Sequence, residues 1–444
     1  MLPYLLRMNP TDPTTPPGAD APASPPAKTN AAALGIVWLV VFIDLLGFGI
    51  VLPVMPRQAG PYLTGLSVEA KGAVIGVLFS IFSLMQFVFS PVWGRISDRI
   101  GRRPVLLISL AGSVVFYALY GFAVTLPESD AMLAIGLMLA ARIGAGIAGA
   151  SVGTAAAVIA DCTPPEKRAK GMALIGIAFG MGFTFGPLIA YFGLALFDQA
   201  PWGVGALASG LSLVAFILAL AVFKETRDPA NKAGKEFFSV AKSMEVLRMP
   251  TVGTLVLIYF LVIFAFAQFE ATLAVLTEAA FSMSIEDNFL VFALVGGVLT
   301  FAGGSYRPMT KKHSEQKLMR FGVFCMMLGL AGLAAVAFAA AQPSQPEGLK
   351  AGFYIAMSIA VVGFAYVNPS VSALVSKRAD PSRQGEVMGV NQAFASLGRI
   401  MGPFLGSVLF QAGLSHTLPY LSAVGLLVIV LALLPRLRTA PPTV

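Results

Sequence analysis

Long apolar runs separated by short polar segments follow one another from about residue 34 almost to the C-terminus. Each run has roughly the 20 residues that an α-helix needs to cross the hydrocarbon of a bilayer. Residues 1–33 are rich in Pro, Ala and Thr and predict a disordered tail. The pattern predicts twelve spans, centred near Asp44, Ser83, Val115, Gly146, Gly182, Val214, Phe264, Gly297, Leu330, Gly363, Phe394 and Leu427.

The twelve spans form two sets of six. The first set occupies residues 34–223 and the second residues 251–436. A basic connector at residues 224–250 joins them, and residues 437–444 form a short C-terminal tail. The fold class is therefore an all-α membrane protein with two six-helix halves.

The basic residues orient these spans in the membrane. Of the 30 lysines and arginines, 25 lie in segments that share one side if the N-terminus is cytoplasmic. Arg57, Lys71 and Lys350 fall on the other side, and Arg142 and Arg399 fall inside spans. Because cytoplasmic loops are enriched in Lys and Arg, both termini are predicted to be cytoplasmic, in a cell (inner) membrane.

Composition excludes several classes of function. The chain is 57% hydrophobic and only 12% charged, whereas a soluble domain carries roughly 25% charged residues. Cys162 and Cys325 form no disulfide framework or metal-ligand spacing, and His313 and His416 are the only histidines. We expect no enzyme activity, no metal or cofactor, and no nucleic-acid partner, since the basic loops alternate with spans.

One short motif occurs twice. Residues 182–187 read GFTFGP and residues 398–403 read GRIMGP, so both are G-x-x-x-G-P in the fifth span of their half. G-x-x-x-G allows close helix packing, and the proline removes one backbone hydrogen bond. Each copy alone is equally explained by packing and a bend, but the matched pair indicates duplication of a six-helix unit. The motif residues are Gly182, Gly186, Pro187, Gly398, Gly402 and Pro403.

Several further segments carry a family resemblance. GRISDRIGRRPVLL, which starts at Gly94, is similar to the signature of the loop between helices 2 and 3 in the major facilitator superfamily. ARIGAGIAGA around Arg142 and GMGFTFGPLIA resemble its helix-4 and helix-5 antiporter motifs. DLLGFGIVLPVMP, IADCTPPEKRAKG and FKET add a resemblance to tetracycline/proton antiporters and their animal tetracycline-transporter-like relatives.

The resemblance implies two pseudo-symmetric six-helix bundles that work by alternating access. It also implies a cytoplasmic gate that holds the halves together when the cavity opens outward; a solvated positive loop is the alternative. The gate residues are Gly94, Asp98, Arg99, Gly101, Arg102 and Arg103.

The chain departs from the tetracycline antiporters at their charged positions. Those proteins are known for acidic residues in helices 3 and 9 and a histidine in helix 8, and the corresponding spans here hold none. The seventh span, AQFEATLAVLTEAAF with Glu270, looks more like the animal relatives, which are associated with organic anions. Tetracycline is therefore a doubtful substrate.

Four charged residues within spans are candidates for proton coupling or substrate binding. A charge at mid-bilayer costs at least roughly 2.5–3.5 kcal/mol, so each needs a reason. Asp44 lies mid-membrane and is either a proton-coupling carboxylate or half of a structural ion pair, with Arg142 as its natural partner. Arg142 alternatively binds an anionic substrate. Glu270 is a second titrating site, a ligand for a cationic group or a solvated residue, and Arg399 is an anion ligand or pairs with Glu270 or a carbonyl.

Uncharged polar side chains form a second group of cavity candidates. They either bind substrate or join helices by hydrogen bonds, which is at least as common. This group comprises Gln86, Gln268, Asn368, Asn391 and Gln392.

The sequence thus favours a monomeric, proton-coupled exporter of a small amphipathic organic compound or drug, driven by the proton gradient. An importer or facilitator of an organic anion or metabolite in the same fold is the alternative. A non-transporting sensor or chaperone is disfavoured, because no segment looks like an appended signalling domain. A membrane enzyme is disfavoured, because the sequence shows no nucleophile–base arrangement, metal-ligand set or phosphate-binding loop.

Overall fold

The computed structural model describes residues 31–51, 53–163, 168–227, 240–344, 346–380, 383–413 and 415–438. Residues 1–30 of the predicted tail, 228–239 of the predicted connector and 439–444 of the C-terminal tail lie outside this part. All regular secondary structure within it is helical. Eleven helices are long and apolar enough to span a membrane, and α7 (Arg168–Leu196) supplies the remaining span. The prediction of twelve spans is confirmed.

The first half contains six spans in chain order. α1 begins at Ala31 rather than Leu34, and the fourth span is divided into two α-helices by a 3₁₀ turn. The spans are α1 (Ala31–Val51), α3 (Val68–Ile100), α4 (Arg102–Ala123), α5 (Ala131–Ala148) with η3 (Gly149–Ser151) and α6 (Val152–Cys162), α7, and α8 (Gly203–Val222). Short helical segments lie between spans at α2 (Met55–Ala59), η1 (Gly60–Leu63) and η2 (Glu128–Asp130).

The second half follows a short helix of the connector, α9 (Val240–Arg248). Its fourth span, α13, is continuous. The six spans are α10 (Pro250–Phe281), α11 (Ile285–Thr310), α12 (Glu315–Ala340), α13 (Leu349–Arg378), α14 (Gln384–Ala412) and α15 (Leu418–Leu433), which continues into η5 (Leu434–Arg438).

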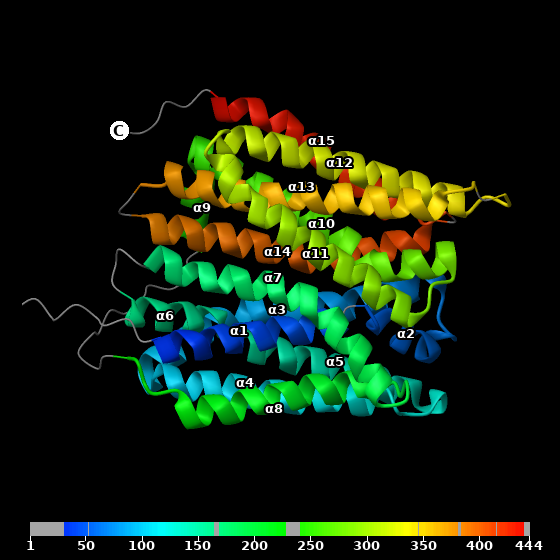
Figure 1. The fold of residues 1–444 in the computed structure, drawn as a ribbon, viewed down its shortest axis with the longest axis horizontal. Helices are drawn as coiled ribbons and strands as arrows, with labels where there is room; N and C mark the ends of the chain where they lie inside the picture. The colour runs from blue at the N-terminus through cyan, green and yellow to red at the C-terminus, as the bar shows by residue number, and fades with distance from the viewer. Residues whose placement is uncertain are drawn as a thin grey trace, which may run out of the picture.

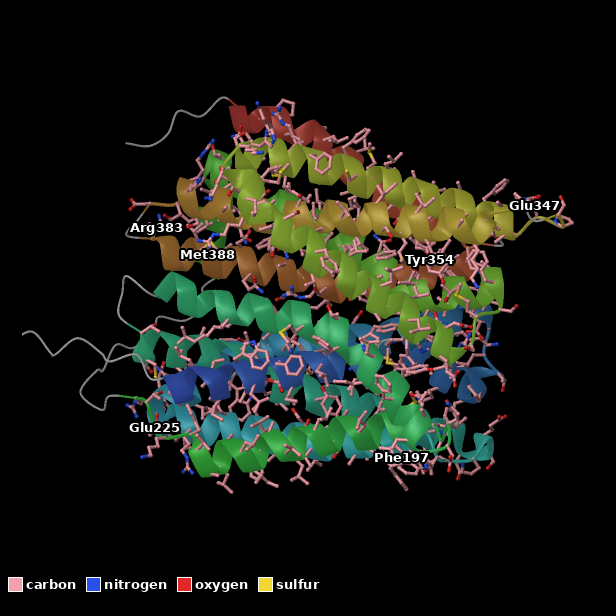
Figure 2. The ribbon with its side chains drawn as sticks, in the orientation of Figure 1. Phe197, Glu225, Glu347, Tyr354, Arg383 and Met388 are labelled. Atoms are coloured by element: carbon pink, nitrogen blue, oxygen red, sulfur yellow. The ribbon has the colours of Figure 1, made fainter. Side chains whose placement is uncertain are left out.

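The two halves lie side by side with their helices roughly aligned (Figure 1). α3 and α7 of the first half pack against α14 and α11 of the second. α1 begins and η5 ends at the same end of the molecule, which also carries Glu225 and Arg383; we call it the terminal end (Figure 2). Phe197 and Glu347 lie at the opposite end, the far end (Figure 2).

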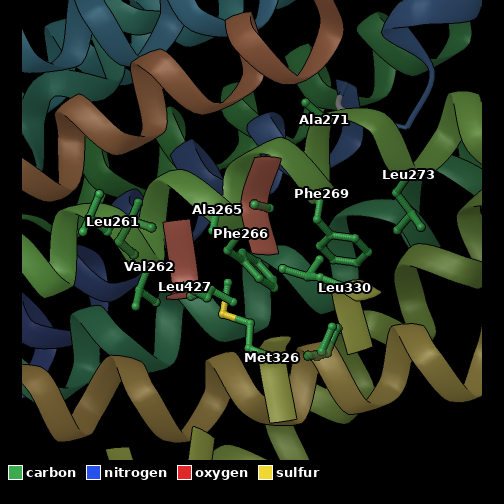
Figure 3. Packing of buried hydrophobic residues seen from close by; sticks show 14 of the residues in the cluster. Leu261, Val262, Ala265, Phe266, Phe269, Ala271, Leu273, Met326, Leu330 and Leu427 are labelled. Carbon is green, nitrogen blue, oxygen red and sulfur yellow. The ribbon is translucent and has the colours of Figure 1, made fainter. Parts of the chain in front are cut away.

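Apolar side chains fill the interior of the second half. Phe266 and Phe269 of α10 meet Met326 and Leu330 of α12 and Leu427 of α15 (Figure 3). The Phe266 ring also stacks on Phe364 of α13, with ring centroids 3.8 Å apart. Four helices therefore share one aromatic and aliphatic core.

The repeated glycine motif lies at equivalent helix pairs. Gly182 and Gly186 of α7 pack on the backbone of α1, and a Cβ on Gly186 would lie 2.9 Å from the carbonyl carbon of Gly49. Gly398 and Gly402 of α14 pack on α10 in the same way, with the Phe264 carbonyl oxygen 2.9 Å from a Cβ on Gly402. The motif thus brings the fifth span of each half against the first span of that half.

The backbones of α12 and α13 also approach each other closely. A Cβ on Gly363 would lie 2.3 Å from the backbone nitrogen of Met326 and 2.5 Å from the Gly322 carbonyl oxygen. Backbone atoms cannot rotate away as a flexible side chain can, so only glycine fits here.

Replacing Gly363 by alanine is expected to destabilise the protein, because α12 and α13 must separate to admit the methyl group. Overpacking costs about 1–3 kcal/mol. Gly425→Ala in α15 is the matched control, since nothing lies within 4 Å of a Cβ there; it should be neutral or stabilising by up to about 1 kcal/mol. Thermal unfolding in detergent distinguishes the two, and equal midpoints would contradict this packing.

Candidate functional site

Asp44 lies on α1 in the interior of the first half and is only 2% exposed. Ser113 of α4 donates a hydrogen bond to its Oδ1 at 3.2 Å, and Ser151 of η3 donates to its Oδ2 at 3.2 Å. The Tyr117 hydroxyl donates to the Asp44 carbonyl at 3.5 Å. An ionised carboxylate in an apolar interior needs such donors. The charge state of Asp44 therefore affects the hydrogen bonds that join α1 to α4 and to the fourth span.

Arg142 does not pair with Asp44 in the structure, which differs from the sequence prediction. Its Nε donates to the Leu78 carbonyl at 3.1 Å, and its guanidinium carbon lies 4.6 Å from the centroid of the Phe82 ring. The reason is that Asp44 and Arg142 lie at different depths along the helix bundle. Asp44 is level with Ser151, and Arg142 precedes Ser151 by nine residues, about 13 Å of helix.

Glu270 and Arg399 lie in the second half, on α10 and α14. The Oε1 atom of Glu270 is buried without a hydrogen-bond partner. Glu270 lines a small cavity of about 10 Å³ whose other walls are apolar, including Phe266, Phe269 and Phe292. Arg399 Nη2 donates to Ser396 Oγ at 3.3 Å, and the charges of Glu270 and Arg399 interact without a direct ion pair between these two described residues.

The predicted polar candidates have different environments. Asn391 is buried and its Oδ1 has no hydrogen-bond partner, whereas Gln392 is exposed. The other three join neighbouring helices: Gln86 donates to the Gly149 carbonyl at 3.1 Å, Ser422 donates to Gln268 at 2.5 Å, and Tyr259 donates to Asn368 at 2.7 Å.

Two of the predicted gate residues, Asp98 and Arg102, form ion pairs at the terminal end of the first half. Arg102 Nη1 lies 2.5 Å from Asp98 Oδ1, and its Nε lies 3.2 Å from Asp161 Oδ2 in the last turn of α6. Gly94 accepts a hydrogen bond from Ser97, and Arg99 accepts one from Arg227 through its carbonyl. In this conformation the loop is held to its own half.

The side chain of Glu225, just after α8, caps the N-terminus of α4, the helix that follows this loop. α4 follows Gly101, which has no side chain to cap it and a φ of 106°. Glu225 accepts the backbone N–H groups of Arg102 at 2.9 Å and Arg103 at 3.1 Å, and those of Thr226 and Arg227. The φ of Gly101 requires glycine, and a Cβ there would also displace the Glu225 carboxylate, since it would lie 2.3 Å from Oε2. Partial burial would raise the pKa of Glu225, but the N–H donors outweigh it and lower the pKa.

Within the part of the chain that the structure describes, contacts between the two halves extend from the far end toward the middle of the helix bundle. Small residues of α3 meet α14 closely, and a Cβ on Gly72 would lie 2.8 Å from the Ser407 carbonyl oxygen. Polar contacts join Arg57 to Glu278 at 2.9 Å, Gln199 to Glu286 at 2.6 Å, Ser80 to the Ile400 carbonyl at 2.6 Å, and Thr184 to Thr300 at 3.2 Å. The far end is therefore closed.

Sequence reasoning missed several of these residues. Ser113 and Ser151 resemble any small residue in an apolar span, so no pattern marks them as ligands of Asp44. Asp161 and Glu225 carried a signal, since both fall in segments that resemble the superfamily, IADCTPPEKRAKG and FKET. Their link to Arg102 and to the start of α4 needed the structure.

The twelve spans in two paired halves have the architecture of a membrane transporter. The sequence profile of the Major Facilitator Superfamily matches residues 37–403 and 351–444, and the chain belongs to this superfamily.

The relatives refine this classification. The chain is 31% identical to the class C tetracycline resistance protein of Escherichia coli, over 87% of this chain and 92% of that protein. It is 26% identical to the mouse (Mus musculus) major facilitator superfamily domain-containing protein 10, over 88% and 89%. Among solved structures, the human organic anion transporter MFSD10 (TETRAN) matches with a TM-score of 0.61 at 24% identity, covering 91% of this chain and 99% of that one. A D-xylose-proton symporter matches with a TM-score of 0.72 at 18% identity, over 93% and 97%.

Glu225→Gln should destabilise the protein in a pH-dependent way. The lowered pKa means that the ionised carboxylate stabilises the fold above the ordinary glutamate value of 4.5, and that this contribution is lost as the pH falls through the lowered value. For this exposed residue we expect about 0.5–1 kcal/mol at neutral pH. Unfolding midpoints of the two proteins should differ at pH 7 and converge in acid; a difference independent of pH would contradict the capping role.

Charge reversal should test the far-end ion pair. Arg57→Glu removes the ion pair with Glu278 and the hydrogen bond to the Met283 carbonyl, and the double variant Arg57→Glu with Glu278→Arg restores the ion pair. A partly exposed pair contributes up to about 1 kcal/mol, which changes the ratio of closed to open molecules about fivefold. The readout is labelling of Thr300→Cys, in a background without Cys162 and Cys325, by a maleimide applied from the far side. The single variant should label faster and the double variant at the parent rate; equal rates in all three would remove the gating role.

Proposed function

We propose that this transporter is a proton-coupled antiporter that exports a small amphipathic organic compound or drug by alternating access. The observation that carries the proposal is the Asp44 carboxylate, buried in the bundle with one hydroxyl donor on each oxygen. The energy source is the proton gradient, without a cofactor.

Asp44 provides a proton site with a mechanical consequence. The ionised carboxylate accepts both hydroxyls, whereas a proton on one oxygen turns that acceptor into a donor. Protonation therefore changes the bonds from α1 to α4 and to η3, rather than an Asp44–Arg142 ion pair. Loss of these bonds alters how the first half packs, and the far-end contacts of Arg57 and Ser80 are those that must open in the other state.

The substrate is proposed from the relatives and from the interior. Tetracycline resistance proteins and an organic anion transporter are both similar to this chain. α4 and α12 hold no acidic residue and α11 no histidine within the membrane, which argues against tetracycline itself. The interior combines aromatic rings with Glu270 and Arg399, which suits a molecule with an apolar body and a charged group.

An importer or facilitator of an organic anion is the second candidate. Arg142 and Arg399 are both positioned within the spans, and guanidinium groups bind carboxylates by paired hydrogen bonds. The G-x-x-x-G-P motif of α7, similar to the antiporter motif, favours export instead. Transport into proteoliposomes under an imposed pH gradient separates the two, because a proton-coupled antiporter accumulates substrate in exchange for protons, whereas a facilitator only equilibrates it.

We place both termini in the cytoplasm, with the protein a monomer in the cell (inner) membrane. The distribution of Lys and Arg supports this orientation, because the terminal end carries most of them. The far end, with the Arg57–Glu278 pair, then faces outward.

Asp44→Asn should uncouple transport from the proton gradient. The amide keeps the shape of the side chain but takes up no proton. Proteoliposomes are given an imposed pH gradient and a panel of fluorescent organic anions and cationic dyes. We expect that the variant loses gradient-driven accumulation but still exchanges substrate in counterflow.

Asp130→Asn is the matched control, since Asp130 is an exposed acidic residue in η2. This variant should accumulate substrate as the parent does. If Asp44→Asn also keeps full gradient-driven accumulation, the proton-coupling role is wrong.

A further inference from the structure

The fourth span of the first half is interrupted in the middle of the membrane. α5 ends at Ala148, the 3₁₀ turn η3 occupies Gly149–Ser151, and α6 continues from Val152. A 3₁₀ turn replaces the i→i+4 hydrogen bonds of the α-helix by i→i+3 bonds of poorer geometry, and lipid offers no donors to strengthen them. Hydrogen bonds from other parts of the protein to the carbonyls of this segment therefore stabilise the break.

Three consecutive carbonyls at the break accept hydrogen bonds from side chains of neighbouring helices. Trp93 of α3 donates to Ile147 at 2.6 Å, Ser109 of α4 to Ala148 at 2.8 Å, and Gln86 of α3 to Gly149 at 3.1 Å. Donors from two helices thus hold one short stretch of backbone. This arrangement indicates a break built into the fold rather than local irregularity.

The second half has no such break. The offset of the repeated motif places Gly149 opposite Ala365, and α13 runs continuously from Leu349 to Arg378 around that position. The interruption therefore belongs to the half that contains Asp44.

Ser151 joins the break to Asp44. It is the last residue of η3, and its hydroxyl donates to Asp44 Oδ2 at 3.2 Å. A serine hydroxyl in a helix can instead donate to the carbonyl three or four residues earlier. For Ser151 these carbonyls belong to Ala148 and Ile147, which currently accept from Ser109 and Trp93.

We propose that the η3 break is a hinge set by the protonation of Asp44, with Ser151 as the positioning residue that connects them. When Asp44 is ionised, Ser151 donates to it, and Trp93 and Ser109 donate to the Ile147 and Ala148 carbonyls. When Asp44 is protonated, Ser151 turns to its own helix and competes for the Ile147 carbonyl, so Trp93 loses its partner. This hinge rests on the proposed proton-coupled function, and it identifies η3 as the segment whose hydrogen bonds change when Asp44 is protonated.

Few other titratable groups lie near Asp44. Tyr117 of α4 contacts its backbone, and α8 has no titratable residue. The remaining charged or titratable residues of the helices packed on α1 lie away from Asp44 along their helices: Arg102, Arg103 and Tyr120 of α4, Asp161 and Cys162 of α6, and Arg168, Lys170 and Tyr191 of α7.

Trp93 itself can report on the hinge. The chain has three tryptophans, so Trp38→Phe with Trp202→Phe leaves Trp93 as the only one. Its emission is followed in lipid nanodiscs as the pH is lowered, with no substrate present. We expect a sigmoidal shift in the parent, none in Asp44→Asn or Ser151→Ala, and recovery in Ser151→Thr, which keeps the hydroxyl.

Two controls separate this role from a general effect of serine removal. Ser212→Ala removes a buried hydroxyl that bonds within α8, to the Ala208 carbonyl, and should leave the shift unchanged. Ser113→Ala removes the other donor to Asp44 and should move the midpoint without abolishing the shift.

The hinge is wrong if Trp93 emission does not change with pH, or if Ser151→Ala responds as the parent does. Because the measurement uses no substrate, its outcome is independent of transport. A silent Trp93 together with transport that depends on Asp44 removes the hinge alone. A responsive Trp93 without gradient-driven transport removes the proposed function alone.

Discussion

A carboxylate inside an apolar bundle has to be given hydrogen-bond donors, because lipid and hydrocarbon side chains offer none. In the first half these donors are the hydroxyls of Ser113 and Ser151, and their positions require that α4 and the fourth span both reach α1 at the depth of Asp44. The 3₁₀ turn places Ser151 there. Trp93, Ser109 and Gln86 then stabilise the turn, so a single buried charge is linked to five side chains from three other spans.

The halves share their packing and differ in their chemistry. Glycines of the repeated motif bring α7 to α1 and α14 to α10 in equivalent ways. The polar interior is not repeated, since Asp44 has two hydroxyl donors and Glu270 instead leaves one oxygen beside a small apolar cavity. Duplication explains the shared packing of the two halves, whereas the buried charged residues and their surroundings differ between them.

The sequence predicted the fold because lipid imposes a strong constraint on span length and apolarity. The twelve spans follow from that constraint, and the resemblance around Asp98 indicates the superfamily. The partners of charged residues did not follow. Arg142 was expected to pair with Asp44, but helix rise separates them, and Ser151 fills the position instead. The break at Gly149 has no sequence signature beyond glycine, because it depends on donors from α3 and α4.

Direct observation of the proton on Asp44 tests the central claim most directly. Infrared difference spectra of the protein in lipid resolve the stretching band of a protonated carboxyl group as the pH is lowered. We expect a band that is absent in Asp44→Asn and shifted in frequency in Ser151→Ala, because the hydrogen bond to that group changes. A protonated-carboxyl band that is the same in Asp44→Asn as in the parent would contradict it.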